Sequence, residues 1–136
     1  RIIYRTIRRF FLDIKNILVC ITQQKTCERL IKKAAVLRHE LHGDLFVIHV
    51  VKNDVNFLNS DCEGEALEYL FDISKSVGAN LTVIKSDQVA EAIAEFAKNN
   101  DIGCLVIGSS PKNQNKNSFL SELKEHLKDV EIVVIP

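Results

Sequence analysis

The stretch VIGSSPKNQNKNSFL, residues 106–120, holds the groups in this sequence that best suit a binding site. An apolar run ends at Gly108, and the nine residues that follow are all Ser, Pro, Lys, Asn or Gln. Glycine lets a ligand approach the backbone closely. We expect Ser118 to cap a short helix, whose first N–H groups and dipole attract phosphate. Lys112 and Lys116 add positive charge. The loop is therefore either a solvated connection or a binding site for an anion.

Patterns that would support catalysis or metal binding are missing from the sequence. The loop is neither a Walker A sequence nor a G-x-G-x-x-G turn. No paired carboxylates and no Ser/His/Asp set can be recognised, and the four histidines are scattered. The four cysteines form no C-x-x-C pair and have no zinc-site spacing. Cys20 and Cys104 lie in apolar runs, where we expect buried reduced thiols, and Cys62 lies near a predicted helix start, where a thiolate would be favoured. The sequence predicts a protein that is not an enzyme and holds no metal.

The composition excludes two further classes of function. The 18 basic and 18 acidic residues balance to a formal net charge of zero, which argues against a dedicated nucleic-acid binder. No apolar run is long enough to span a bilayer, and no secretory signal pattern occurs. We therefore expect a cytoplasmic protein. Its 136 residues suit a single domain with one core.

Apolar runs and helical patterns alternate along the chain after residue 14. The runs predict five buried strands at residues 16–22, 44–51, 79–85, 102–108 and 130–136. Apolar residues at helical spacing predict helices between them, at residues 26–43, 60–78, 86–100 and 118–127. Continuous apolar strands imply burial on both faces. The sequence therefore predicts a three-layer α/β domain with an open, mainly parallel five-stranded sheet.

Specific residues are expected to begin and end these helices. Gly43 is the predicted C′ residue of the first helix, and Ser60 with Glu63 forms a capping box for the second. Ser86 or Asp87 is the predicted N-cap of the third. The apolar residues of the second helix are Ala66, Leu67, Leu70, Phe71 and Ile73. Ligands of open α/β sheets bind beyond the carboxyl ends of the strands, so the loops there are the candidate site.

Residues 1–14 form a basic amphipathic segment that precedes the domain. Arginines alternate with apolar residues, and Ile3, Ile7 and Phe10 follow helical spacing. Such a segment could touch a membrane surface or a partner. Alternatively, it is a connecting segment that packs on its own domain or on a neighbour. Membrane contact is expected only if this segment is a tether.

Residues 15–136 resemble a universal stress protein domain. NILVCIT resembles the first strand of that family, DLFVIHVV the second with its His49–Val50 pair, and IGCLVIGSS the fourth. SDQVAEAIAEFAKNNDIGCLVIG has the layout of the family's third helix leading into the glycine-ended strand. Within the family, the chain is similar to stand-alone members and to the domain associated with potassium-sensor histidine kinases.

The resemblance implies a fold, a ligand and a dimer. The fold is a Rossmann-like sheet of the adenine nucleotide alpha-hydrolase-like type, with strand order 3-2-1-4-5. The ligand is ATP or AMP, held without catalysis. The cofactor-binding positions implied are Cys20, Thr22, Val50, Gly108, Ser109, Ser110, Asn117, Ser118 and Phe119. The partner is a second copy of the chain, paired through the last strand, Val130 to Pro136, whose apolar residues would lie at a sheet edge.

Two departures from the family pattern predict weak ATP binding. The ATP-binding members carry a G-x2-G-x9-G-[ST] loop, and Pro111 stands here at the second glycine. Proline has no N–H to donate to a phosphate. The family's acidic residue after the first strand is Thr22 in this chain, and a hydroxyl accepts hydrogen bonds less strongly than a carboxylate. The motifs by which some sensor-kinase relatives bind cyclic di-AMP are also missing.

Two functions are compatible with these observations. The first is a nucleotide-binding regulatory or stress-response module without catalytic activity. The second is a ligand-free dimerisation or docking module, such as a cytoplasmic regulatory domain of a sensor kinase or transporter. We further expect that Gly108→Val would abolish ligand binding with little unfolding.

Overall fold

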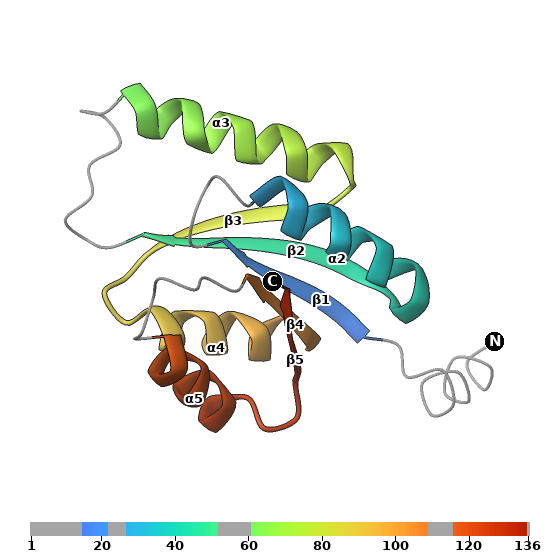
Figure 1. Cartoon of the computed structure of the whole chain (residues 1–136), viewed down its shortest axis with the longest axis vertical. Coiled ribbons are helices and arrows are strands. Elements are labelled where there is room, and N and C mark those ends of the chain that lie inside the picture. The colour runs from blue at the N-terminus through green and yellow to red at the C-terminus, as the bar shows by residue number, and fades with distance from the viewer. Residues whose placement is uncertain (1–14, 22–26, 52–60, 109–115, 136) are drawn as a thin grey trace.

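The computed structural model describes residues 15–21, 27–51, 61–108 and 116–135, and strands and helices alternate along them (Figure 1). The predicted segment 1–14 and the cap residue Ser60 lie outside these residues. The elements are β1 (Lys15–Ile21), α2 (Cys27–Leu41), β2 (His42–Val51), α3 (Asp61–Ser76), β3 (Asn80–Lys85), α4 (Val89–Asn99), β4 (Ile102–Gly108), α5 (Lys116–His126) and β5 (Glu131–Ile135).

The strands form one parallel sheet in the order β3-β2-β1-β4-β5, which confirms the predicted fold. β1 lies at the centre, and its ladder with β2 ends at the pair Ile21 and His49. Its ladder with β4 ends at the pair Cys20 and Ile107. From β1 the chain proceeds through β2 to β3 at one edge of the sheet. From β4 it proceeds to β5 at the other edge. The strand order therefore reverses between β1 and β4.

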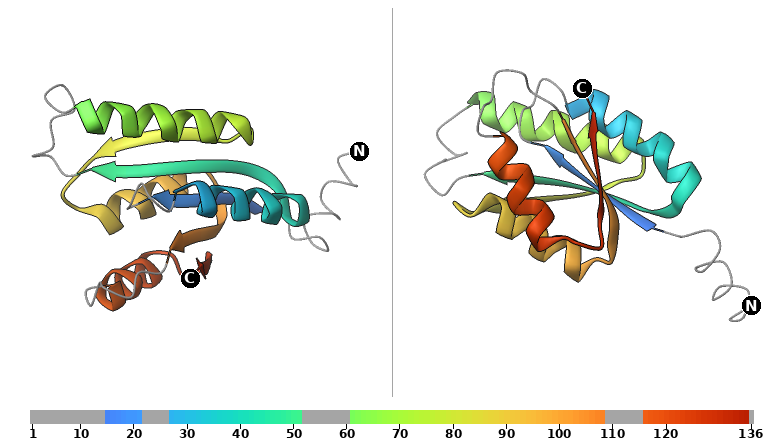
Figure 2. Two further views of the ribbon diagram at one scale, coloured as in Figure 1. Left: turned by 45° about the horizontal axis from the view of Figure 1, so that its top comes forward. Right: turned by 60° about the horizontal axis from the view of Figure 1, so that its bottom comes forward.

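Two helices cover each face of the sheet (Figure 2). One core layer joins α2 and α3 to the sheet and contains Ile17, Val19, Leu30 and Ile31, all almost inaccessible to solvent. The other joins α4 and α5 to the opposite face and includes Leu18 and Leu105. Burying one such side chain contributes about 1.5–3 kcal/mol, so both layers stabilise the central strands strongly.

The ends of several helices differ from their predicted caps. Gly78, with φ of 72°, ends α3 as predicted, and the N–H groups of Gly78 and Ala79 bond back to carbonyls in the last turn of α3. By contrast, α2 is followed by His42 in the left-handed conformation, with φ of 60°, so the prediction of Gly43 at this position was wrong. Gly43 lies one residue later, in β2.

The predicted N-caps of α4 and α5 were also wrong. Gln88 precedes α4 and makes no side-chain cap bond. The Oγ of Ser86 instead accepts the N–H of Gln88 at 3.0 Å, before the helix, while the Ser86 N–H bonds to the Val51 carbonyl at 2.8 Å. These two bonds hold Ser86 in the turn after β3. α5 begins at Lys116, so Ser118 belongs to its first turn and does not precede it.

Asn16 ties together three segments at the amino edge of the sheet. Its Nδ2 donates to the Asn100 carbonyl at 2.9 Å, and its Oδ1 accepts the Asp44 N–H at 2.9 Å. Asn16 lies where the register of β1 shifts against both neighbouring strands. The side chain therefore supplies hydrogen bonds where the ladders are irregular.

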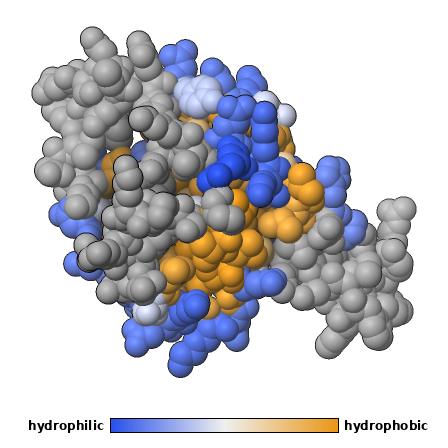
Figure 3. Space-filling view, viewed as in Figure 1, coloured by the Kyte–Doolittle hydropathy of each residue, from blue (hydrophilic) through white to orange (hydrophobic). Residues whose placement is uncertain are grey.

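Some large apolar side chains remain exposed. Phe71 of α3 is 53% exposed, whereas Ser74 of the same helix is buried, and the Ser74 Oγ donates to the Leu70 carbonyl at 2.8 Å. At the two sheet edges, Val134 of β5 is 42% and Val83 of β3 is 40% exposed. Figure 3 shows apolar surface near the middle of the face seen in Figure 1, in the area where β4 and β5 lie.

Candidate functional site

The carboxyl edge of the sheet brings three of the predicted site residues to neighbouring strands. Cys20 lies one residue before the end of β1, Val50 one residue before the end of β2, and Gly108 is the last residue of β4. The register places Cys20 beside Ile107, so Gly108 follows directly at the point where the strand order reverses. Parallel α/β sheets bind ligands at such a reversal.

Gly108 allows a close contact between β4 and α2. A Cβ atom at residue 108 would lie 3.1 Å from Cδ1 of Leu30, a side chain that is buried in the core layer of α2. Gly108 is not among the described residues with positive φ. The structure thus relates this glycine to helix–strand packing, and the effect of Gly108→Val on folding stays a prediction that depends on how far the Leu30 side chain can shift.

The ends of β1 and β2 are joined by a side chain as well as by their ladder. The Nδ1 atom of His49 lies 2.8 Å from the carbonyl oxygen of Ile21, the last residue of β1. His49 is half-buried and directly precedes Val50. The sequence identified His49 only as a strand residue, because the bond depends on a register between segments 28 residues apart.

Of the remaining predicted site residues, the structure describes only those at the start of α5. Thr22, Ser109, Ser110 and Pro111 are outside the described residues. Asn117 and Ser118 belong to the first turn of α5, where backbone N–H groups have no partner within the helix, and Phe119 follows them. Phe119 is partly buried and packs against the core layer of α4 and α5. The backbone N–H groups of Asn117 and Ser118 are therefore the described candidates for binding an anion at this helix end.

The described thiols are not reactive groups of this edge. Cys20, Cys27 and Cys104 are buried and form no disulfide. Burial raises the pKa of the Cys20 thiol far above its ordinary value. Burial also raises the pKa of Cys27, against the smaller opposing effect of backbone hydrogen bonds. All of this favours the neutral thiol, as expected from the apolar surroundings. The side chain of Cys62 lies outside the described part.

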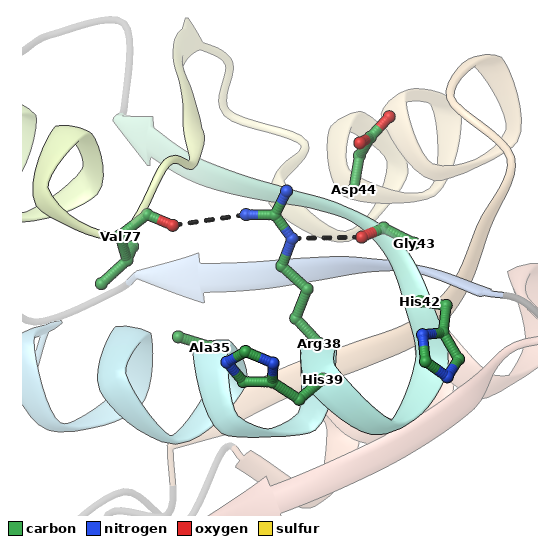
Figure 4. A pocket seen from close by; sticks show the side chains of 7 residues that line it. All are labelled: Ala35, Arg38, His39, His42, Gly43, Asp44 and Val77. Carbon is green, nitrogen blue, oxygen red and sulfur yellow. Dashed lines mark hydrogen bonds between the residues drawn. The ribbon is translucent and has the colours of Figure 1, made fainter.

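An open pocket lies at the opposite, amino edge of the sheet, between the end of α2 and the start of β2 (Figure 4). Arg38 crosses it: Nε donates to the Gly43 carbonyl at 3.2 Å, and Nη1 donates to the carbonyls of Val77 at 3.3 Å and Gly78 at 3.4 Å. The guanidinium group therefore satisfies carbonyls just beyond α3. Sequence analysis missed this role, because the partners are 39 and 40 residues away.

The described residues form neither a cluster of metal-binding side chains nor a membrane-spanning helix. Nowhere in residues 15–21, 27–51, 61–108 and 116–135 do three or more His, Cys, Asp or Glu side chains gather as they would around a metal ion. Within the same ranges, no helix has both the length and the apolar character needed to cross a membrane.

The open parallel sheet, whose strand order reverses between β1 and β4, defines an α/β domain of the nucleotide-binding type. The model of the universal stress protein family matches residues 13–125, which is most of the chain. The chain belongs to the universal stress protein family. This confirms the resemblance inferred from the strand motifs.

Solved structures of similar fold come from the same family. A universal stress protein in complex with cAMP superposes with a TM-score of 0.65 at 12% identity, covering 90% of this chain and 96% of that one. One from Archaeoglobus fulgidus in complex with dAMP has a TM-score of 0.62 at 19% identity, covering 90% and 98%. A family member from Burkholderia pseudomallei has a TM-score of 0.65 at 18% identity, covering 90% and 96%.

Curated relatives at this level of similarity include the sensor protein KdpD of Mycobacterium tuberculosis, in strains CDC 1551 and H37Rv. Each is 23% identical over 100 residues, which are 74% of this chain. The matched region is only 11% of the length of either KdpD protein. The similarity therefore concerns one part of a much longer protein.

Proposed function

We propose that this domain is a regulatory or stress-response module that binds an adenine nucleotide, AMP or ATP, without catalysing a reaction on it. The observation that carries the proposal is the position of Gly108, which ends β4 beside β1 where the strand order reverses. Family membership supports it, as do the relatives of the same fold in complex with cAMP and dAMP.

The described residues suit the two ends of such a ligand. On the base side, Cys20 and Val50 each lie one residue before the end of neighbouring strands, and Val50 lies beyond the last register pair of β1 with β2. On the phosphate side, the first turn of α5 offers the N–H groups of Asn117 and Ser118, and Phe119 follows them. Thr22, Ser109 and Ser110 complete the proposed set from the sequence.

Binding of ATP should be weak because of two residues. Pro111 removes one N–H donor from the loop, and Thr22 replaces a carboxylate. Calorimetry with ATP and AMP tests the proposal directly, together with mass spectrometry of any nucleotide that copurifies. Thr22→Asp should tighten ATP binding about tenfold or more, because a charged acceptor strengthens a hydrogen bond by roughly 1–2 kcal/mol. Thr22→Asn, which adds no charge, is the matched control.

A chain that binds neither nucleotide in calorimetry, and carries none from the cell, would contradict this function. A submicromolar ATP affinity of the unmodified chain would contradict the weak-binding part alone, and would mean that the other loop amides suffice.

The second candidate function is a dimerisation or docking module within a larger cytoplasmic protein. The exposed Val134 on the edge strand β5 favours it, and so does the match to a short part of KdpD. In this proposal residues 15–136 are the domain, residues 1–14 connect or tether it, and two copies pair through Val130 to Pro136. An empty protein that still dimerises would favour this function over the first.

A further inference from the structure

The ring of His49 makes a hydrogen bond whose direction is set by its partner. The carbonyl oxygen of Ile21, 2.8 Å from Nδ1, can only accept a hydrogen bond. The proton must therefore be on Nδ1, and in the neutral ring Nε2 carries none. The bond fixes both the tautomer and the orientation of the imidazole.

This bond lies where the backbone ladders of β1 stop. Ile21 and His49 are the last register pair of β1 with β2, and the ladder of β1 with β4 ends one residue earlier, at Cys20 and Ile107. The imidazole thus holds the end of β1 beyond its pairing with β4. Val50, next to His49, and Gly108, next to Ile107, are the neighbouring strand ends that the proposed nucleotide site uses.

The imidazole lies on the α2 and α3 side of the sheet. Side chains alternate between the two faces along a strand, and Val47, two residues before His49, belongs to the core layer of α2 and α3. Ile21 belongs to the same layer. His49 is therefore placed to act on the site through the Ile21 carbonyl and the main chain of β1.

We propose that His49 is a positioning residue of the nucleotide site, which rests on the function proposed above. By holding the Ile21 carbonyl, it fixes the end of β1 relative to Val50 and Gly108. A ligand that contacts main-chain groups of three strand ends needs those ends at fixed separations, because reordering them on binding costs free energy. Loss of the bond should weaken nucleotide binding more than it weakens the fold.

Three substitutions at His49 distinguish the effect of losing the hydrogen-bond donor from the effect of losing the imidazole ring. Asparagine places its Nδ2 the same number of bonds from Cβ as Nδ1 of histidine, so His49→Asn can keep the bond to Ile21. His49→Gln moves the donor one bond further out, and His49→Leu removes it. Asn16→Ala is the matched control, because it removes hydrogen bonds between segments at the opposite edge of the sheet.

The measurement is calorimetry with AMP, at a temperature where each variant is folded by circular dichroism. His49→Leu should bind AMP about tenfold more weakly, the effect of one lost hydrogen bond to a buried partner, and His49→Asn should stay within about threefold of the unmodified chain. Asn16→Ala should lower the melting temperature and leave AMP affinity unchanged. The ¹⁵N shifts of the His49 ring should report a protonated Nδ1 at neutral pH.

The outcomes distinguish this inference from the function on which it rests. An unmodified chain that does not bind AMP overturns both. A chain that binds AMP equally well with histidine or leucine at residue 49 overturns the inference alone, as does a ring protonated only on Nε2. If His49→Leu does not fold, the remaining pair decides: the inference requires His49→Asn to bind AMP at least about threefold more tightly than His49→Gln.

Discussion

Gly108 and Leu30 pack so closely that a Cβ atom at residue 108 would lie 3.1 Å from Cδ1 of Leu30, and the Leu30 side chain would have to shift to accept it. The glycine at the end of β4 therefore serves the core, whatever else it does for a ligand. A loss of nucleotide binding in a variant of Gly108 would not by itself locate the site.

Gly108→Val should lower the free energy of unfolding by about 1–3 kcal/mol, because added atoms in a packed core force neighbouring side chains to shift. Urea unfolding measures the change. In a double-mutant cycle with Leu30→Ala, the two changes should be less than additive, since the shorter side chain makes room for valine. Strict additivity would mean that the Leu30 contact is not the cause.

Arg38→Gln should destabilise the fold by about 1–2 kcal/mol, because the carbonyls of Gly43 and Val77 lose a charged donor. Lys33→Ala, an exposed change on the same helix, is the control and should alter the unfolding free energy by less than about 0.5 kcal/mol. The comparison requires chemical unfolding of both variants. Equal stability of the two would show that the carbonyls beyond α3 are satisfied equally well by water.

The proposed homodimer should depend on Val134 and not on Val83, which are similarly exposed on opposite edge strands. Val134→Lys should shift the mass measured by light scattering from about twice the 15.4 kDa chain mass toward the monomer. Val83→Lys should leave it unchanged. Val133 suits this test less well, because it is partly buried against the core. The prediction fails if the unmodified chain is monomeric at high micromolar concentration, or if only Val83→Lys dissociates it.

The phenol of Tyr69 should ionise at higher pH than an ordinary tyrosine. Its hydrogen bond of 2.6 Å to the Glu28 carboxylate raises the pKa of Tyr69, since the bond favours the protonated phenol. The contribution of this contact to stability is therefore present below the ordinary tyrosine pKa and is lost as pH rises through the raised value. In a Tyr4→Phe background Tyr69 is the only tyrosine, so tyrosinate absorbance reports it alone.

Adding Glu28→Gln to that background should lower the titration midpoint of Tyr69, because the charged acceptor is gone. Glu68→Gln, next to Tyr69 in the chain, is the control and should have little effect. Equal midpoints with Glu or Gln at residue 28 would rule out this cause. The Glu28 carboxylate itself has a lowered pKa, first because of its hydrogen bond from Lys32 and then because of that from Tyr69.

The strands could be predicted because burial of both faces leaves continuous apolar runs in the sequence, and their order followed from the resemblance to the family. The apolar run at residues 102–108 corresponds to β4 residue for residue. The helix ends could be predicted less well, since Ser86 and Asp87 are good cap residues by type. The tertiary hydrogen bond between Ser86 and Val51 decides the turn instead.

The carboxyl edge of the sheet, where we propose the site, could be predicted from the sequence, but the contacts that support this edge could not. Gly108 and Val50 follow from the strand ends and from the family motifs. The contacts of Gly108 with Leu30 and of His49 with Ile21 depend on which strands and helices become neighbours. Those distances exist only after the sheet has its register.

The central place of β1 has a consequence for synthesis on the ribosome. β1 is translated before every other strand of the sheet, but its second partner, β4, follows only after β2, α3, β3 and α4. At about 5–20 residues per second, the β4-facing edge of β1 waits several seconds for its partner. During that time an apolar strand with unpaired N–H and C=O groups is open to wrong pairing. A nascent chain of this protein should therefore need a chaperone most before β4 leaves the exit tunnel.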